Sequence, residues 1–209
     1  MVKVKICGIT TQEAATTALE SGADFIGFVF YPKSPRYIEP HKAKEIADSL
    51  PVSIKKVGLF VEPTDQQIQE IYNENIIDYI QLHGHETPER AKHIRKHFPG
   101  LKIIKALPIS NESSIDVTKD YSEYVDWFLF DAPESALPGG NGIPFDWNLV
   151  KNIDSMKPWF LAGGLNASNV YGAIKETQAH GVDVSSGVEI EPGKKDLKKI
   201  QDVIKEAKK

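Results

Sequence analysis

The chain has 209 residues, of which 41% are hydrophobic and 26% charged, with a formal net charge of −4 and a single cysteine. This composition is typical of a globular protein with a real core, and the length fits one domain over residues 1–209. The acidic charge argues against a nucleic-acid partner, the lone cysteine excludes an intrachain disulfide, and no apolar run could span a membrane, so we expect a cytoplasmic protein.

Short apolar runs alternate with amphipathic helical patterns along the whole chain. The runs predict eight strands, at residues 2–9, 25–30, 57–61, 79–82, 102–107, 127–130, 159–162 and 182–184. Several of the runs, such as residues 25–30, 127–130 and 159–162, are continuous apolar stretches rather than alternating with polar residues. This pattern indicates strands of a parallel sheet that is buried on both faces.

Helix-start signals follow the first three of these strands. Thr10 with Glu13 predicts a capping box at the start of the first helix. Pro40 suits the first turn of the second helix, because its fixed backbone angle matches the helix and its missing N–H costs nothing there. Thr64 with Gln67 predicts a second capping box.

Later signals complete the alternation. Thr87 is predicted to begin the fourth helix, a weaker helix is expected within residues 110–121, and Asp146 and Asn166 are expected to cap two further helices. The lysines at the end of the chain are interpreted as the solvated face of a closing helix. They are Lys194, Lys195, Lys198, Lys199, Lys205, Lys208 and Lys209.

Eight strand–helix units favour a (β/α)8 TIM barrel with a parallel eight-stranded sheet. An open doubly wound sheet fits the same alternation. However, no Gly-x-Gly-x-x-Gly follows the first strand, which argues against a dinucleotide-binding sheet. We therefore expect a closed barrel.

In such a barrel, function lies at the carboxyl ends of the strands and in the loops that follow them. The polar residues predicted there are Cys7, the loop Ser34-Pro35-Arg36, His83, Asp131, Gly163-Gly164 and Ser185-Ser186-Gly187. Taken singly, each also has a structural interpretation: a buried cysteine, a paired arginine or a core histidine is common. A carboxylate that ends an apolar strand is costly to bury unless it is paired or used.

Two glycine-containing loops make a more specific pattern. Gly163 and Gly164 follow the seventh strand, and Ser186 and Gly187 follow the eighth. Barrels recurrently bind phosphate in these two loops, where glycine lets backbone N–H groups approach the anion. We therefore predict a phosphate site, although tight turns alone would also explain the glycines.

The motifs together closely resemble those of phosphoribosylanthranilate isomerases, in order from about residue 3 to residue 190. They are Lys5-Ile6-Cys7-Gly8-Ile9-Thr10, Gly27-Phe28-Val29-Phe30, Ser34-Pro35-Arg36, Val57-Gly58-Leu59-Phe60-Val61, Gln81-Leu82-His83-Gly84, Gly139-Gly140-Asn141-Gly142, Phe145-Asp146-Trp147, Leu161-Ala162-Gly163-Gly164-Leu165 and Asp183-Val184-Ser185-Ser186-Gly187-Val188-Glu189. Asn141 departs from the threonine of the family's loop, which leaves the contacts of that loop open.

The resemblance implies the Amadori rearrangement of N-(5-phosphoribosyl)anthranilate in tryptophan biosynthesis, with no metal or redox cofactor. It implies that Asp131 is the general acid and Cys7 the general base. Arg36 would bind the anthranilate carboxylate, with His83 and Asp183 as further substrate-lining residues. The substrate phosphate would lie on Gly163, Gly164, Ser186 and Gly187. A monomer and a homodimer are both compatible with it.

The same scaffold also carries other functions. Indole-glycerol-phosphate synthase shares related phosphate loops but needs a catalytic set of lysine and carboxylate groups, and a ribulose-phosphate epimerase needs a cluster of His and Asp that supports a metal. The histidines here do not form such a pattern. A non-catalytic phosphate-binding barrel would not require both Cys7 and Asp131 at strand ends.

Overall fold

Eight parallel strands close into a barrel in chain order, and the last strand pairs with the first. The structure is a computed structural model, which describes residues 1–111, 113–132, 146–151, 153 and 155–209. The strands are β1 (Lys3–Cys7), β2 (Phe25–Val29), β3 (Lys55–Phe60), β4 (Tyr79–Leu82), β5 (Lys102–Pro108), β6 (Trp127–Asp131), β7 (Trp159–Leu161) and β8 (Gly181–Val184). The predicted (β/α)8 barrel is confirmed.

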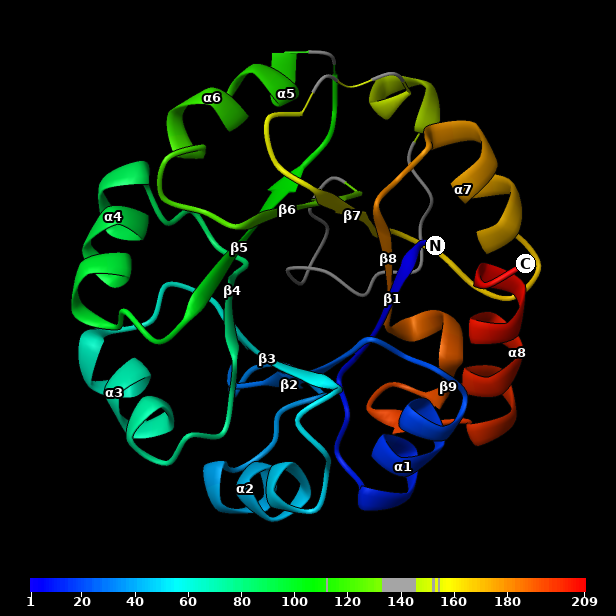
Figure 1. The fold of residues 1–209 in the computed structure, drawn as a ribbon, viewed down its shortest axis with the longest axis horizontal. Helices are drawn as coiled ribbons and strands as arrows, with labels where there is room; N and C mark the ends of the chain where they lie inside the picture. Colours follow the sequence, from blue (N-terminus) through cyan, green and yellow to red (C-terminus); the bar gives the residue numbers. More distant parts are fainter. Residues whose placement is uncertain (112, 133–145, 152, 154) are drawn as a thin grey trace.

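Helices surround this ring of strands (Figure 1). They are α1 (Gln12–Glu20), α2 (Pro40–Asp48), α3 (Asp65–Asn73), α4 (Pro88–His97), α5 (Ser113–Asp116), α6 (Thr118–Tyr121), the 3-10 helix η1 (Trp147–Val150), α7 (Val170–Thr177) and α8 (Leu197–Ala207). The weak helix expected within residues 110–121 is the short pair α5 and α6.

Local capping chemistry explains where several helices begin. The capping box of Thr64 and Gln67 is present at α3, and the Thr87 side chain accepts from the backbone N–H of Arg90 at the start of α4. The capping box predicted at Thr10 is wrong. The N-cap of α1 is Thr11, because the Thr10 hydroxyl instead donates to the Gly193 carbonyl at 3.3 Å.

Two later helix starts also differ from the prediction. Asp146 caps the 3-10 helix η1 rather than an α-helix, and its side chain accepts from the N–H of Asn148. The N-cap of α7 is Asn169 and not Asn166. Asn166 instead organises a turn before the helix, where its Oδ1 accepts from the backbone N–H of Ser168 at 2.9 Å.

Side chains of the strands, together with Ala162 just after β7, fill the barrel interior. This cluster contains Phe25, Val57, Tyr79, Ile104, Ala106, Leu129, Phe160 and Ala162, with Trp127 packed against it. The Phe25 ring meets Tyr79 edge-on with centroids 5.4 Å apart, and Trp127 stacks on Phe160 at 4.4 Å. Because Phe25, Tyr79 and Trp127 begin their strands, large rings close the amino-terminal end. The carboxyl end is thereby left for a cavity.

A hairpin that the sequence patterns did not predict lies between β8 and α8. The 3-10 helix η2 (Ser186–Val188) leads into β9 (Glu189–Glu191), which pairs antiparallel with β10 (Lys194–Lys195). Lys195 is buried, with only 1% of its side chain exposed. The prediction that Lys195 belongs to a solvated lysine face was therefore wrong. Its ammonium group instead pairs with the buried carboxylate of Glu189.

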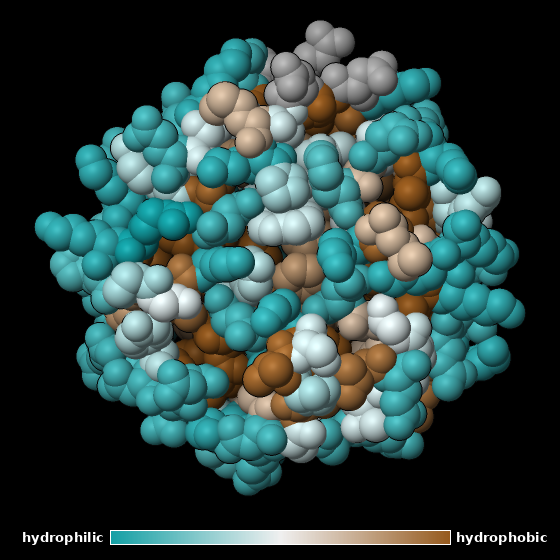
Figure 2. Space-filling view, in the orientation of Figure 1, coloured by the Kyte–Doolittle hydropathy of each residue, from teal (hydrophilic) through white to brown (hydrophobic). Residues whose placement is uncertain are grey.

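Hydrophilic side chains cover most of the rim of the face shown in Figure 2, with hydrophobic ones between them. Within the described part of the chain, no helix is both long enough and apolar enough to cross a bilayer.

Candidate active site

A cavity of about 630 Å³ opens at the carboxyl ends of the strands. This volume includes the open mouth of the cavity. The predicted site residues that line it are Cys7, Arg36, His83, Asp131, Gly163, Gly164, Asp183 and Ser186. Gly187 is the one predicted site residue that does not. The thiol from β1 and the carboxyl from β6 therefore face the same cavity.

Cys7 ends β1, where it packs with Val29 and Leu59 at the apolar wall of the cavity. Gly27 makes room for it, since a Cβ on Gly27 would lie 2.9 Å from the Cys7 Sγ. Burial raises the pKa of the Cys7 thiol, and the nearby positive charge of Lys5 opposes that shift. The unliganded protein therefore holds mainly the neutral thiol at neutral pH.

A pH titration of the single thiol would test this arrangement. Because the pKa of Cys7 is raised, the thiolate should form only as the pH rises above the ordinary range of a free thiol. Alkylation by iodoacetamide should accordingly be slow at neutral pH and accelerate in base. Lys5→Met should move the midpoint further upward, since it removes the cation that favours the thiolate. A midpoint at or below that of a free thiol would contradict the assignment, and Cys7→Ser provides the blank.

Lys5 lies two residues before Cys7 on β1, so both side chains point to the same face of the strand. It is fully buried, and its Nζ is 2.9 Å from Oδ2 of Asp183 on the neighbouring strand β8. Burial works against the ammonium, but the pairing with Asp183 and the proximity of Cys7 outweigh it and raise the pKa of Lys5. From the sequence, Lys5 was identified only as part of a family motif, with no role of its own. Its period-two relation to Cys7 was the signal that could have identified it.

Asp183 lines the cavity, and only one of its two carboxylate oxygens has a partner among the described residues. Oδ2 holds Lys5, whereas Oδ1 is buried and has no hydrogen-bond partner among the described residues. A buried acceptor without a partner is costly. An oxygen left in this state beside a cavity is suited to accept a hydrogen bond from a ligand.

Asp131 ends β6, and the backbone N–H of the next residue holds its carboxyl group. Its Oδ1 accepts from the N–H of Ala132 at 2.8 Å, and its Oδ2 is 3.4 Å from Nε2 of His83. The other ring nitrogen of His83, which directly follows β4, is 2.7 Å from Nε2 of Gln81 within that strand. Position 163 favours glycine, because its φ of +84° is one that L side chains rarely adopt and a Cβ would also lie 3.0 Å from the Ala132 nitrogen. The chain thus fixes the carboxyl at the cavity edge.

Arg36 is buried and forms an ion pair with Glu189, which is buried as well. Its Nε and Nη2 each donate to a different oxygen of Glu189, both at 2.8 Å. Lys195 holds the same carboxylate, with its Nζ 2.8 Å from Oε1. Burial would raise the pKa of Glu189, but the hydrogen bonds and charges of Arg36 and Lys195 outweigh it and lower that pKa. Sequence reasoning identified Arg36 but neither of these two partners.

The two predicted phosphate loops lie against each other. Gly163 and Gly164 adopt φ values of +84° and +64°, which only glycine adopts readily. A Cβ on Gly187 would lie 1.9 Å from the carbonyl oxygen of Leu165, so the loop after β8 can pack on the loop after β7 only with glycine at that position. Gly187 therefore joins the loops although it does not face the cavity.

The described side chains offer no ready-made metal centre. Within the described ranges, no group of three or more His, Cys, Asp and Glu side chains is arranged to hold a metal ion. The predicted loop around Asn141 lies outside the described residues.

Comparison with known proteins gives consistent matches over the whole chain. A sequence model of the family described as "N-(5'phosphoribosyl)anthranilate (PRA) isomerase" matches residues 4–206. A curated relative from Paramagnetospirillum magneticum, named N-(5'-phosphoribosyl)anthranilate isomerase, is 46% identical over 99% of this chain and 97% of its own. The crystal structure of phosphoribosyl anthranilate isomerase from Thermotoga maritima is 42% identical and covers 100% of this chain and 99% of its own, with a TM-score of 0.90.

A second solved structure carries a ligand. It is a phosphoribosyl anthranilate isomerase in complex with reduced 1-(o-carboxyphenylamino)-1-deoxyribulose 5-phosphate. It is 41% identical to this chain, covers 100% of it and 99% of its own chain, and superposes with a TM-score of 0.87.

Proposed function

The chain belongs to the N-(5'-phosphoribosyl)anthranilate isomerase family and is an isomerase of tryptophan biosynthesis; from this premise we propose that it works by general acid–base catalysis, with Asp131 as the acid and Cys7 as the base. The observation that carries the proposal is their shared cavity, beside two glycine loops suited to a phosphate. Its substrate is N-(5'-phosphoribosyl)anthranilate, and its product is 1-(2-carboxyphenylamino)-1-deoxyribulose 5-phosphate.

The first step opens the ribose ring. Protonated Asp131 gives its proton to the ring oxygen while the lone pair of the substrate nitrogen forms a C=N bond at the first sugar carbon. The carbon–oxygen bond of the ring breaks, and its electrons stay with the oxygen. The result is a sugar hydroxyl, an iminium ion and an ionised Asp131.

The second step removes a proton from carbon. The iminium makes the hydrogen on the second sugar carbon acidic, and the Cys7 thiolate takes it. The electrons form a C=C bond and neutralise the nitrogen, giving an enolamine that relaxes to the ketone. The small thiolate population is maintained by the positive charge of Lys5, which opposes the effect of burial on the pKa of the thiol.

Binding groups hold the substrate across both steps. We assign the phosphate to Gly163, Gly164 and Ser186, where backbone N–H groups can approach an anion closely. The unpartnered Oδ1 of Asp183 would accept a hydrogen bond from the substrate, since the contact between Lys5 and Oδ2 holds the carboxyl in place. His83, beside Asp131, would act by positioning that carboxyl.

We assign the anthranilate carboxylate of the substrate to Arg36, which lines the cavity. Arg36→Ala should therefore raise the KM for phosphoribosylanthranilate by about 10- to 100-fold, because a hydrogen bond between charged groups contributes roughly 1.5–3 kcal/mol. The effect on kcat should be smaller if the carboxylate is bound equally well in the ground state and the transition state. Steady-state kinetics would check this. Unchanged KM and kcat would show that another group binds the carboxylate.

A direct assay tests the function as a whole. Phosphoribosylanthranilate is generated from anthranilate, and the loss of its fluorescence is followed after enzyme is added. We expect turnover by the unmodified chain. Failure of the purified, folded protein to consume this substrate would refute the assignment.

A further inference from the structure

The hairpin of β9 and β10 carries a buried lysine that the catalytic scheme does not use. Nζ of Lys195 lies 2.8 Å from Oε1 of Glu189 and 3.0 Å from the carbonyl oxygen of Ser185. Neither Lys195 nor Glu189 lines the substrate cavity, whereas Arg36 and Ser185 do. Lys195 therefore contacts the cavity wall from behind.

The charges in this cluster do not cancel. Arg36 and Glu189 alone would form a neutral pair through two bonds of 2.8 Å. Such a pair would attract an anion only weakly, because the carboxylate of Glu189 would repel it. Lys195 adds a second cation to the same carboxylate, so the three side chains together carry one net positive charge. Burying an extra ammonium is unfavourable unless it is paired or used.

Close packing around Arg36 restricts both its side chain and the loop that carries it. A Cβ on Gly8 would lie 2.8 Å from Cδ of Arg36, and a Cβ on Gly193 would lie 2.3 Å from the carbonyl oxygen of Pro35. The hairpin therefore touches the loop that carries Arg36. With its stem confined and its Nε–Nη2 edge held by Glu189, the planar guanidinium has a fixed direction.

We propose that Lys195 is a positioning residue that makes this end of the cavity selective for an aromatic ring bearing a carboxylate. Its ammonium group gives the cluster with Arg36 and Glu189 a net positive charge. It also links Glu189 to the carbonyl oxygen of Ser185 through hydrogen bonds. The proposal rests on the role proposed for Arg36 as the group that binds the substrate carboxylate.

The test compares two inhibitors that differ only in the carboxylate. The first is reduced 1-(o-carboxyphenylamino)-1-deoxyribulose 5-phosphate, and the second is the same molecule with an unsubstituted phenyl ring. The ratio of their Kd values, measured by calorimetry, isolates recognition of the carboxylate. General loosening of the site weakens both inhibitors and leaves the ratio unchanged. We expect the unmodified protein to prefer the carboxylated inhibitor by about 10- to 100-fold.

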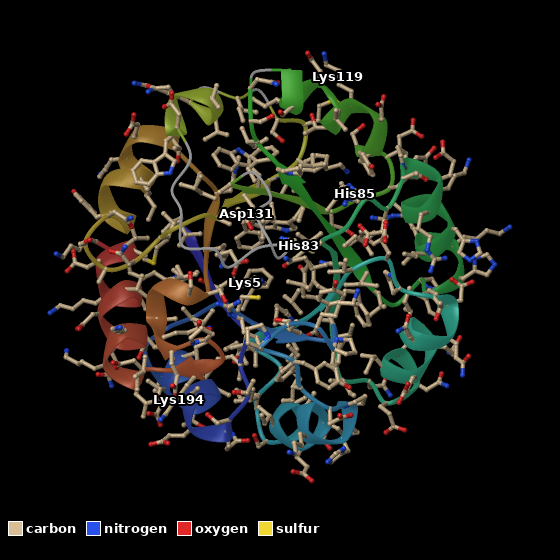
Figure 3. The ribbon with its side chains drawn as sticks, turned by 180° about the vertical axis from the view of Figure 1, so that it is seen from behind. Lys5, His83, His85, Lys119, Asp131 and Lys194 are labelled. Atoms are coloured by element: carbon tan, nitrogen blue, oxygen red, sulfur yellow. The ribbon has the colours of Figure 1, made fainter. Side chains whose placement is uncertain are left out.

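Lys195→Gln removes the charge but keeps a donor, and we expect the preference to fall by about tenfold or more. Lys195→Met is a second neutral variant, in case the first does not fold. Lys195→Arg keeps the charge and should retain most of the preference. Lys194→Gln is the matched control, because Lys194 is the neighbouring residue, 64% exposed, and lies away from the barrel centre in Figure 3. It should retain the ratio of the unmodified protein.

Arg36→Ala separates this proposal from the proposed function. If Arg36→Ala abolishes the preference while both neutral variants of Lys195 keep it, the role of Lys195 is overturned and that of Arg36 stands. If Arg36→Ala itself keeps the preference, the carboxylate is bound elsewhere, and both assignments fail. Loss of the preference in Arg36→Ala and in a neutral Lys195 variant supports the proposal.

Discussion

Cys7→Ala should lower kcat by about 10²- to 10⁴-fold, the range that a positioned base typically contributes. The substrate would still bind and its ring would still open, because neither the phosphate loops nor Asp131 is touched. The proton on the second sugar carbon would then have no base in place. The loss should therefore appear in kcat and leave the affinity for substrate nearly unchanged.

Folding should survive this change. Cys7 packs with Val29 and Leu59, and alanine removes only the sulfur from that cluster. Thermal unfolding and binding of the reduced product analogue provide the two checks on structure. Cys7→Ser is a useful second variant, because the hydroxyl fills the site but ionises far less readily than the thiol. Near-normal turnover by the alanine variant would exclude the thiolate as the base.

Local chemistry explains why much of the fold was predictable. Strands buried on both faces are mostly apolar, and the helices bury one apolar stripe, so two different periodicities distinguish strands from helices. Thr64 with Gln67 and Thr87 with Pro88 act within one helical turn, and these starts were predicted correctly. The rule that barrel function lies at the carboxyl strand ends then selected Cys7, Asp131 and the glycine loops without any knowledge of contacts.

The parts that were missed depend on residues distant in sequence. Thr10 is not a cap because its hydroxyl meets Gly193, 183 residues away. Lys5 faces Asp183 only because β8 closes the barrel against β1 in a particular register. Lys195 has the spacing of an exposed helical lysine, but the buried carboxylate of Glu189 holds it inside the fold. No local pattern encodes such partners.

Closure of the eight-stranded barrel also determines which side chains lie near one another at its centre. In Figure 3, Lys5, His83 and Asp131 lie towards the middle of the barrel, although they come from three separate strands or strand ends. Lys119 lies at the periphery in the same view. The sequence indicated which residues end strands, whereas the barrel register decides which of them meet.

Asp131→Asn should also reduce kcat by about 10²- to 10⁴-fold, because the ring oxygen loses its proton donor. The substitution is close to isosteric. The carbonyl oxygen of the introduced amide can still accept from the N–H of Ala132, as Oδ1 of the aspartate does at 2.8 Å. We therefore expect the fold and the binding of the reduced product analogue to be kept. Single-turnover measurements should show that ring opening, and not product release, has become slow.

Asp126→Asn offers a matched control for this variant. Asp126 precedes β6 at the opposite end of the barrel, where its Oδ2 accepts from the N–H of Ile103 and pairs with Arg95, each at 2.8 Å. The same chemical change there should lower thermal stability and leave kcat near that of the unmodified protein, since barrel function lies at the other end. If the two variants lost turnover equally, the effect at Asp131 would be structural. If Asp131→Asn kept more than about a tenth of the original kcat, the acid contribution would fall below the usual range, and another group would have to protonate the ring oxygen.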